Sequence, residues 1–169
     1  DTLTGGDDND TFRVTHGTDT ITDLTTGDIL IVTGGTANAT NITNFVATAS
    51  TTSSGTVNLT SGTSNSTINM TSSTSGNFTI TGNSSEDSLT GGSGNDTIVG
   101  SIGNDILNGG SGTNILKYSA SSAGVTIDIS NSTQQDTVGS GLDTVSNFSN
   151  LTGSNHADIL TGDSNANII

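Results

Sequence analysis

The sequence predicts an all-β protein, a parallel β-roll or β-solenoid of stacked nonapeptide repeats with Ser/Thr-rich β-solenoid inserts. Two observations predict this fold. First, only 28% of the 169 residues are hydrophobic and 3% are aromatic, too few for a thick globular core. Second, a nine-residue motif recurs with its aliphatic position in constant phase, which disordered segments of similar composition lack. Thin repeats that each cover their neighbour with one or two apolar side chains can fold on so small an apolar supply.

The repeat is clearest in the middle of the chain, where GGSGNDTIV occupies residues 91–99. The nonapeptides 82–90, 100–108 and 109–117 keep its frame. The sixth position of these four repeats holds an aspartate or its amide: Asp87, Asp96, Asp105 and Asn114. The eighth position holds a large aliphatic residue: Leu89, Ile98, Leu107 and Leu116. Residues 82–117 are therefore predicted to form one β-roll.

Two further segments keep the same frame. Residues 1–31 form a predicted roll with fewer glycines, and residues 153–169 begin another that continues outside the chain. Their sixth positions are Asp1, Asp10, Asp19 and Asp28 in the first segment, and Asp158 and Asn167 in the second. Their eighth positions are Leu3, Phe12, Ile21 and Leu30, and Leu160 and Ile169. Because both ends of the chain fall within a repeat, we expect one module of a longer tandem array.

The charge of the chain favours cations as ligands. Two basic residues stand against sixteen acidic ones, a net charge of −14 that disfavours nucleic acid and bare membrane as partners. Two carboxylates about 4 Å apart repel by about 4 kcal/mol at an effective dielectric constant of ~20. Calcium removes this repulsion, since it accepts six to eight oxygens from carboxylates and carbonyls in flexible geometry. We therefore expect several Ca²⁺ ions, with a roll that is disordered without them and folds on binding.

The ligands should come from stacked turns. Glycine accepts the positive φ of the turn, and in the strand D-x-U-x the aliphatic side chain U points inward. Because two nonapeptides make one turn of the coil, residues eighteen apart should stack. The predicted pairs are Asp1 with Asp19, Asp10 with Asp28, Asp87 with Asp105, and Asp96 with Asn114. Asn9, Asn95 and Asn104 at position five are expected to be turn formers.

The remaining residues are predicted to extend the roll. Residues 32–81 are rich in Ser, Thr and Asn, and the short alternating runs VNL, INM and FTI within them indicate a β-solenoid filler with looser turns. Residues 118–152 are predicted to be a β-strand spacer, in which VTIDI (125–129) alternates as a strand. Glycine and aspartate could also make turns with no ion bound. The same nine-residue spacing of the aspartates in separate segments of the chain argues against that interpretation.

GGSGNDTIV and its companions resemble the RTX (hemolysin-type) calcium-binding nonapeptide repeat, G-G-x-G-x-D-x-U-x. The resemblance implies that the first six positions of each repeat form the ion-binding turn and that the strands form the roll. Residues 118–152 resemble the spacer that commonly precedes a restart of the repeats in this family. Asn114 and Asn167 depart from the Asp pattern and lack charge, so their sites should be weak or empty.

The function we expect is that of a calcium-stabilised structural module of a secreted bacterial protein: a cell-surface adhesin, an S-layer or a matrix filament. Its expected partners are neighbouring copies joined head to tail, with no membrane insertion. The alternative is the C-terminal folding and export domain of a secreted enzyme or toxin. A face that binds ice or glycans would need a flat, regular T-x-T array, which the sequence does not show.

An enzyme is not expected. The chain contains no H-E-x-x-H, G-x-S-x-G or P-loop motif. Its aspartates belong to a periodic scaffold, and almost no aromatic residue is present to hold a sugar. His16 and His156 are isolated in the sequence, and we assign them no role.

Overall fold

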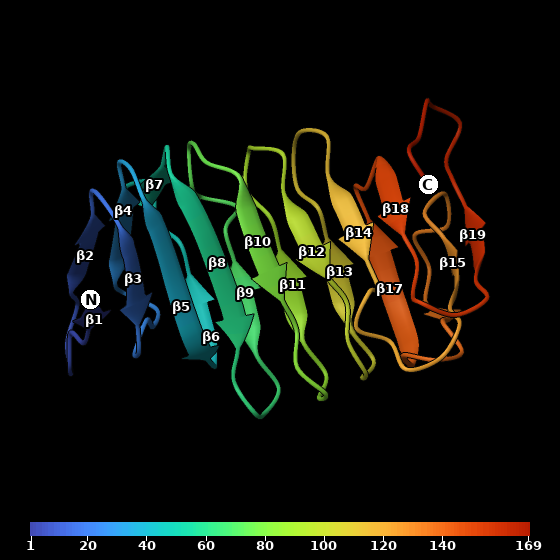
Figure 1. Ribbon diagram of the computed structural model, residues 1–169, viewed down its shortest axis with the longest axis horizontal. Helices are drawn as coiled ribbons and strands as arrows, with labels where there is room; N and C mark the ends of the chain where they lie inside the picture. Colours follow the sequence, from blue (N-terminus) through green and yellow to red (C-terminus); the bar gives the residue numbers. More distant parts are fainter.

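The computed structural model describes residues 1–169 and consists of 19 β-strands joined by turns (Figure 1). All pairs of neighbouring strands but one are parallel, and successive turns of the chain lie side by side along the long axis of the molecule. This confirms the predicted all-β solenoid. The chain has no helix of the length and hydrophobicity needed to cross a membrane.

One face of the solenoid is an eight-stranded parallel sheet that runs along most of the long axis of the molecule (Figure 1). Its strands, in spatial order, are β1 (Thr2–Leu3), β3 (Thr18–Ile21), β5 (Thr36–Ile42), β8 (Thr56–Ser61), β10 (Phe78–Thr81), β12 (Thr97–Val99), β14 (Ile115–Lys117) and β18 (Asn150–Thr152).

The rest of the wall consists of three smaller sheets. A six-stranded sheet contains β6 (Asn44–Val46), β9 (Thr67–Asn69), β11 (Ser88–Thr90), β13 (Ile106–Asn108), β17 (Leu142–Ser146) and the antiparallel edge strand β16 (Gln135–Asp136). The others are β2 (Thr11–Val14), β4 (Ile29–Val32) and β7 (Thr52–Ser53), and β15 (Thr126–Asp128) with β19 (Ile159–Thr161). From β10 to β14 the chain alternates between the eight-stranded and the six-stranded sheet.

The length of one turn differs along the chain. In the middle roll Leu89 pairs with Leu107, eighteen residues on. In the Ser/Thr-rich insert the turns are longer, since Leu59 pairs with Ile80 and Phe45 with Ile68. The insert continues the same sheets as the roll, as the sequence predicted. The division of the chain into five segments describes sequence motifs and stays a prediction.

The longest insertion lies between β14 and β17. Leu116 pairs with Leu151 and Leu107 with Val145, so one turn here takes nearly twice the usual number of residues. The extra residues contain β15 and β16, and β15 pairs with β19 rather than with either large sheet. The segment 118–152 therefore leaves the solenoid and then re-enters it.

The core is a single cluster of 28 buried hydrophobic residues between the sheets. The four aliphatic residues at position eight of the middle roll are fully buried: Leu89, Ile98, Leu107 and Leu116. Each contributes about 1.5–3 kcal/mol on full burial, which the ordering of a nine-residue repeat can offset. Burial alone therefore leaves the roll with little net stability.

Candidate metal-binding turns

The position-six side chains of the middle roll join adjacent turns. The backbone N–H of Asp87 donates to Asp105 Oδ1 at 2.9 Å, and that of Asp96 donates to Asn114 Oδ1 at 2.8 Å. Each donor lies eighteen residues before its acceptor. The structure thus brings together both pairs that the repeat predicted for this roll.

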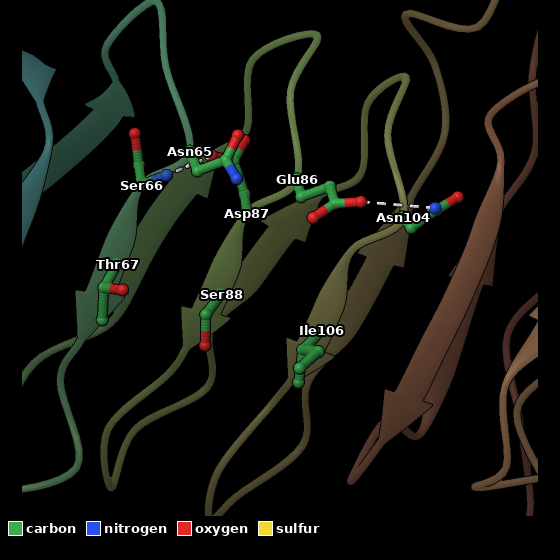
Figure 2. A pocket seen from close by; sticks show the side chains of 8 residues that line it. All are labelled: Asn65, Ser66, Thr67, Glu86, Asp87, Ser88, Asn104 and Ile106. Atoms are coloured by element: carbon green, nitrogen blue, oxygen red, sulfur yellow. Dashed lines mark hydrogen bonds between the residues drawn. The ribbon is translucent and has the colours of Figure 1, made fainter.

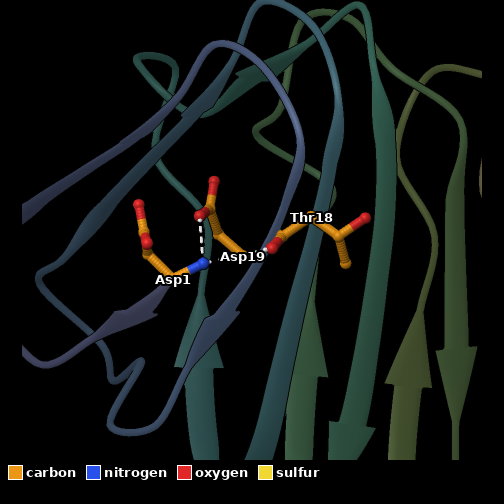
Figure 3. Close-up of polar contacts among 3 residues, drawn as sticks. All are labelled: Asp1, Thr18 and Asp19. Atoms are coloured by element: carbon orange, nitrogen blue, oxygen red, sulfur yellow. Dashed lines mark hydrogen bonds and ion pairs between the residues drawn. The ribbon is translucent and has the colours of Figure 1, made fainter.

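The N-terminal roll has the same arrangement. The backbone N–H of Asp10 donates to Asp28 Oδ1 at 2.9 Å. Figure 3 shows the other predicted pair, in which the ammonium group of Asp1 donates to Asp19 Oδ1 at 2.9 Å and to the carbonyl of Thr18 at 3.2 Å. The side chain of Asp1 itself is 94% exposed, against 13% for Asp19. The two residues of this pair are stacked, but their carboxylates do not lie in similar surroundings.

The second oxygen of each carboxylate binds within its own turn. Asp96 Oδ2 accepts from the backbone N–H of Gly92 at 2.8 Å, and Asp87 Oδ2 from that of Asn83 at 2.7 Å. Ser101 donates its hydroxyl to Asp105 Oδ2 at 3.2 Å. One aspartate therefore closes its own turn and also holds the preceding one.

Position five makes a second set of bonds in the opposite direction. Asn77 Oδ1 accepts from the backbone N–H of Asn95, and Asn95 Oδ1 from that of Thr113, both at 2.8 Å. Asn104 Oδ1 accepts from Leu142 N–H at 2.9 Å. Asn95 and Asn104 were expected to be turn formers. They also bind the following turn, so positions five and six tie each turn to both of its neighbours.

Glycines leave space beside the carboxylates. A Cβ on Gly91 would lie 2.5 Å from Asp96 Oδ2 and would also contact the carbonyl oxygen of Gly109. Gly103 has a φ of 142°, and a Cβ there would lie 2.9 Å from Asp105 Oδ1 and contact the carbonyl of Ser85. Carboxylate and carbonyl oxygens therefore surround space that any larger residue would fill.

This donor set fits calcium. Asp10 Oδ2 is buried and has no hydrogen-bond partner, and a Cβ on Gly5 would contact it. No group of three or more His, Cys, Asp or Glu side chains that could hold a metal occurs in the chain. Main-chain carbonyls and the side-chain oxygens of asparagine would therefore have to supply the other ligands, which calcium accepts. The residues at position six would hold the ion, and its charge would offset theirs.

The buried aspartates repel one another. Burial raises the pKa of Asp105 to about 7, the carboxylates of Asp143 and Asp87 raise it further, and the N–H of Asp87 partly offsets the rise. Burial likewise raises the pKa of Asp96 and of Asp143. A cation beside these groups would favour their charged forms.

Asp143 is a member of this series that the sequence analysis missed. It is fully buried, its Oδ1 accepts from the backbone N–H of Asp105 at 2.9 Å, and its Oδ2 accepts from the Tyr118 hydroxyl at 2.7 Å. The signal was present, because residues 139–145 read GSGLDTV. The insertion after β14 places Asp143 38 residues after Asp105. A comparison of aspartates spaced eighteen residues apart therefore does not find this pair. Asp87, Asp105 and Asp143 are called the aspartate column below.

The predicted asparagine sites differ from the aspartate sites. The amide of Asn114 donates to the carbonyls of Asn147 at 3.1 Å and of Gly110 at 3.4 Å. That amide occupies carbonyl oxygens that a cation would otherwise use. Asn167 donates to the carbonyl of Ser149 at 2.8 Å and to Asp163 Oδ1 at 2.7 Å. Weak or empty sites at these two residues stay a prediction.

Asp158 pairs with the spacer rather than with another position six. Its Oδ1 accepts from the backbone N–H of Val125 at 2.9 Å, and its Oδ2 accepts from that of Ser154 at 3.0 Å. Hydrogen bonds from Val125 and from the Ser154 hydroxyl lower the pKa of this carboxyl. Asp158 therefore anchors β15 to the last repeat.

A cavity of about 230 Å³ lies beside the aspartate column (Figure 2). Glu86 and Asn104 occupy position five of their turns and line it, and Asn104 Nδ2 donates to Glu86 Oε1 at 3.4 Å. Ser66 N–H donates to Asp87 Oδ1 at 2.9 Å on the same wall. Of the three residues of the aspartate column, Asp87 lines this cavity.

Fold and turns together define a calcium-binding structural module. The family model of the RTX calcium-binding nonapeptide repeat matches the chain in four copies, over residues 1–22 and 81–116. No curated protein and no solved structure matches the chain. The chain therefore carries RTX repeats, as the sequence predicted, and RTX repeats bind calcium. Which of the ten predicted residues are ligands stays a prediction.

Proposed function

We propose that the chain is a calcium-stabilised structural module of a secreted protein, working at the cell surface or in the extracellular matrix as part of a tandem-repeat adhesin, an S-layer or a filament. The observation that carries the proposal is the aspartate column. Asp87, Asp105 and Asp143 are at most 3% exposed and stand on successive turns of one solenoid. A buried row of like charges favours a fold that is completed by cations.

Calcium binding and folding are coupled in this proposal. Ligands on adjacent turns meet only in the folded state, so the free energy of binding becomes free energy of folding. Extracellular calcium modules typically have dissociation constants of roughly 10⁻⁴–10⁻³ M. With affinity in that range, the chain would stay unfolded at low cytosolic calcium and fold after export.

We also propose that copies of the module adjoin head to tail. In the eight-stranded sheet β1 has one neighbour, so backbone groups on its other side are free to pair, whereas on the far side of β18 the N–H of Leu151 already donates to the carbonyl of Ile168 at 3.0 Å. Leu3 and Leu160 at the two ends are only partly buried, and Ile159 is 66% exposed. A neighbouring copy would cover these side chains and extend the sheet.

Far-UV circular dichroism of the isolated chain, in EGTA and then in millimolar calcium, tests the proposal, with magnesium at the same concentration as the control. We expect β-structure to increase with calcium and far less with magnesium, which requires more rigid octahedral geometry. Electron microscopy of the same samples should show rods or filaments only with calcium. A β-spectrum already complete in EGTA and unchanged by calcium would contradict coupled folding.

A further inference from the structure

The outward face of the eight-stranded sheet carries a regular array of threonine and asparagine. β8 presents Thr56, Asn58 and Thr60, and β5 presents Thr36, Asn38 and Thr40. The residues between them are buried, so these six side chains point to solvent. The strand pairing aligns Thr36 with Thr56 and Asn38 with Asn58.

The array extends to both sides of these two strands. Thr18 and Thr20 on β3 pair with Thr36 and Asn38. Thr79 on β10 pairs with Asn58, and Thr97 on β12 pairs with Thr79. The array therefore spans five strands. We call these outward side chains of β3, β5, β8, β10 and β12 the threonine face.

The sequence analysis found no regular T-x-T array, and the threonine face is indeed a mixed one, since β5 and β8 present T-x-N-x-T and β12 presents T-x-V. The turns between these strands contain 18, 20 and 21 residues, as the pairs Thr20 with Asn38, Asn38 with Asn58, and Asn58 with Thr79 show. No single period aligns the threonines in the sequence. Only the pairing of the strands places them in rows.

The spacing within the threonine face is nearly uniform. Parallel strands lie about 4.8 Å apart, and outward side chains on one strand repeat at about 6.6 Å. Within these five strands the register shifts once, between Ala39 and Ile42. Asn58 Nδ2 donates to Asn38 Oδ1 at 2.7 Å, which fixes both side chains. The face is thus a two-dimensional lattice of hydroxyl, amide and methyl groups.

The threonine face is uncharged, although the protein carries a net charge of −14. Its members are Thr and Asn, with Val99 at the end of β12, and the first charged residue in these rows is Lys117 on β14. Neither cavity of the molecule is lined by a residue of this face. A charged or pocket-bound ligand therefore has nothing here to recognise it.

We propose that the threonine face binds ice. A neutral lattice matches a partner that is itself neutral and repeats at fixed spacing, and the two spacings are close to repeats of water oxygens on faces of hexagonal ice. Hydroxyls can take lattice positions while the methyl groups order water between them. Crystalline polysaccharide is a poorer fit, because all five aromatic residues are buried and none can stack on a sugar ring.

Partition into slowly growing polycrystalline ice tests this, with the full chain in millimolar calcium. The wild type should be incorporated into the ice rather than concentrated in the liquid. Thr81→Lys places a long charged side chain on the threonine face at the end of β10 and should lose most of that incorporation. Thr90→Lys is the matched control, since Thr90 ends β11 on the other sheet and is equally half-buried. Circular dichroism must show both variants folded.

Three results would overturn the proposal. The first is exclusion of the folded wild type from ice. The second is equal loss of incorporation in folded Thr81→Lys and Thr90→Lys, which would place any binding elsewhere. The third is depletion of the protein onto microcrystalline cellulose together with exclusion from ice, which would assign the face to polysaccharide. Calcium-dependent folding is measured separately, so its failure is distinguishable from each of these.

Discussion

The middle roll, residues 82–117, and the Ser/Thr-rich insert, residues 32–81, belong to the same sheets but close their turns with different chemistry. In the roll, buried carboxylates such as Asp96 bind the backbone of two turns. In the insert, neutral hydroxyls do this. Ser73 is buried, and its Oγ donates to the carbonyl of Thr51, one turn earlier, at 2.7 Å.

The comparison separates the fold from its dependence on a cation. Within the insert, hydroxyl groups such as that of Ser73 join turns without charge. Carboxylates of the roll bind the insert only where the two regions meet, for example at Ser66 and Phe78. Carboxylates in the shorter turns of the roll bring like charges together, and a bound cation would offset their repulsion. One solenoid can therefore contain a calcium-dependent part beside a calcium-independent part. The predictions below test that difference.

Core truncation should affect both regions alike. Ile98→Ala in the roll and Leu59→Ala in the insert each remove a fully buried aliphatic side chain. Each should lower the free energy of unfolding in calcium by about 2–5 kcal/mol, because a cavity remains. Chemical denaturation measures this. A much smaller loss at Leu59 would show that the insert does not share the core of the roll.

Replacing a carboxylate of the column should have opposite effects with and without calcium. Asp105→Asn keeps the hydrogen bond to Asp87 N–H but removes a buried charge. In EGTA the variant should be more stable than the wild type. In calcium at about a hundred times its dissociation constant, it should lack the roughly 2–3 kcal/mol that one bound ion supplies. Denaturation under both conditions measures the crossover, and destabilisation in EGTA would contradict it.

The stability of the calcium-free roll should fall as pH rises. The pKa of Asp105 is about 7 in the folded chain, against 3.8 for the free side chain. A raised pKa means that the folded state binds the proton more tightly. Its contribution is therefore complete below about pH 4 and lost as pH rises through about 7. In EGTA, the melting temperature should be higher at pH 5 than at pH 8.

The matched control for this pH dependence is Asp105→Asn. That variant should show a weaker decline between pH 5 and pH 8, because the main titrating group is gone. A decline as steep as that of the wild type would assign the pH dependence to other groups.

The smallest effect concerns the Tyr118 hydroxyl. Tyr118→Phe removes the hydrogen bond to Asp143 Oδ2 but keeps the buried ring. The free energy of unfolding should fall by about 1–2 kcal/mol, since the carboxylate keeps its other partners. Urea denaturation in calcium measures this. An unchanged midpoint would show that the hydroxyl contributes nothing to the column.

The sequence predicted the features that depend on local periodicity. The nine-residue repeat predicted the solenoid and the stacking of residues such as Asp96 and Asn114. It also predicted that the aliphatic residue of each repeat, such as Ile98, is buried. It could not predict features that depend on turn length. Asp143 carries a local motif, but its partner Asp105 lies 38 residues away, and the rows of the threonine face join turns of different lengths, so the pairing of strands was needed to place both.

Hydrogen exchange of the calcium-bound and calcium-free chain tests the central claim most directly, because it reports on the two regions in one sample. Amides of Asp87, Asp96 and Asp105 in the roll should be protected with calcium and lose that protection in EGTA. Amides of the insert, such as Ser73, whose N–H binds the carbonyl of Met70, should retain most of theirs. Equal protection of the roll with and without calcium would contradict a calcium-dependent fold.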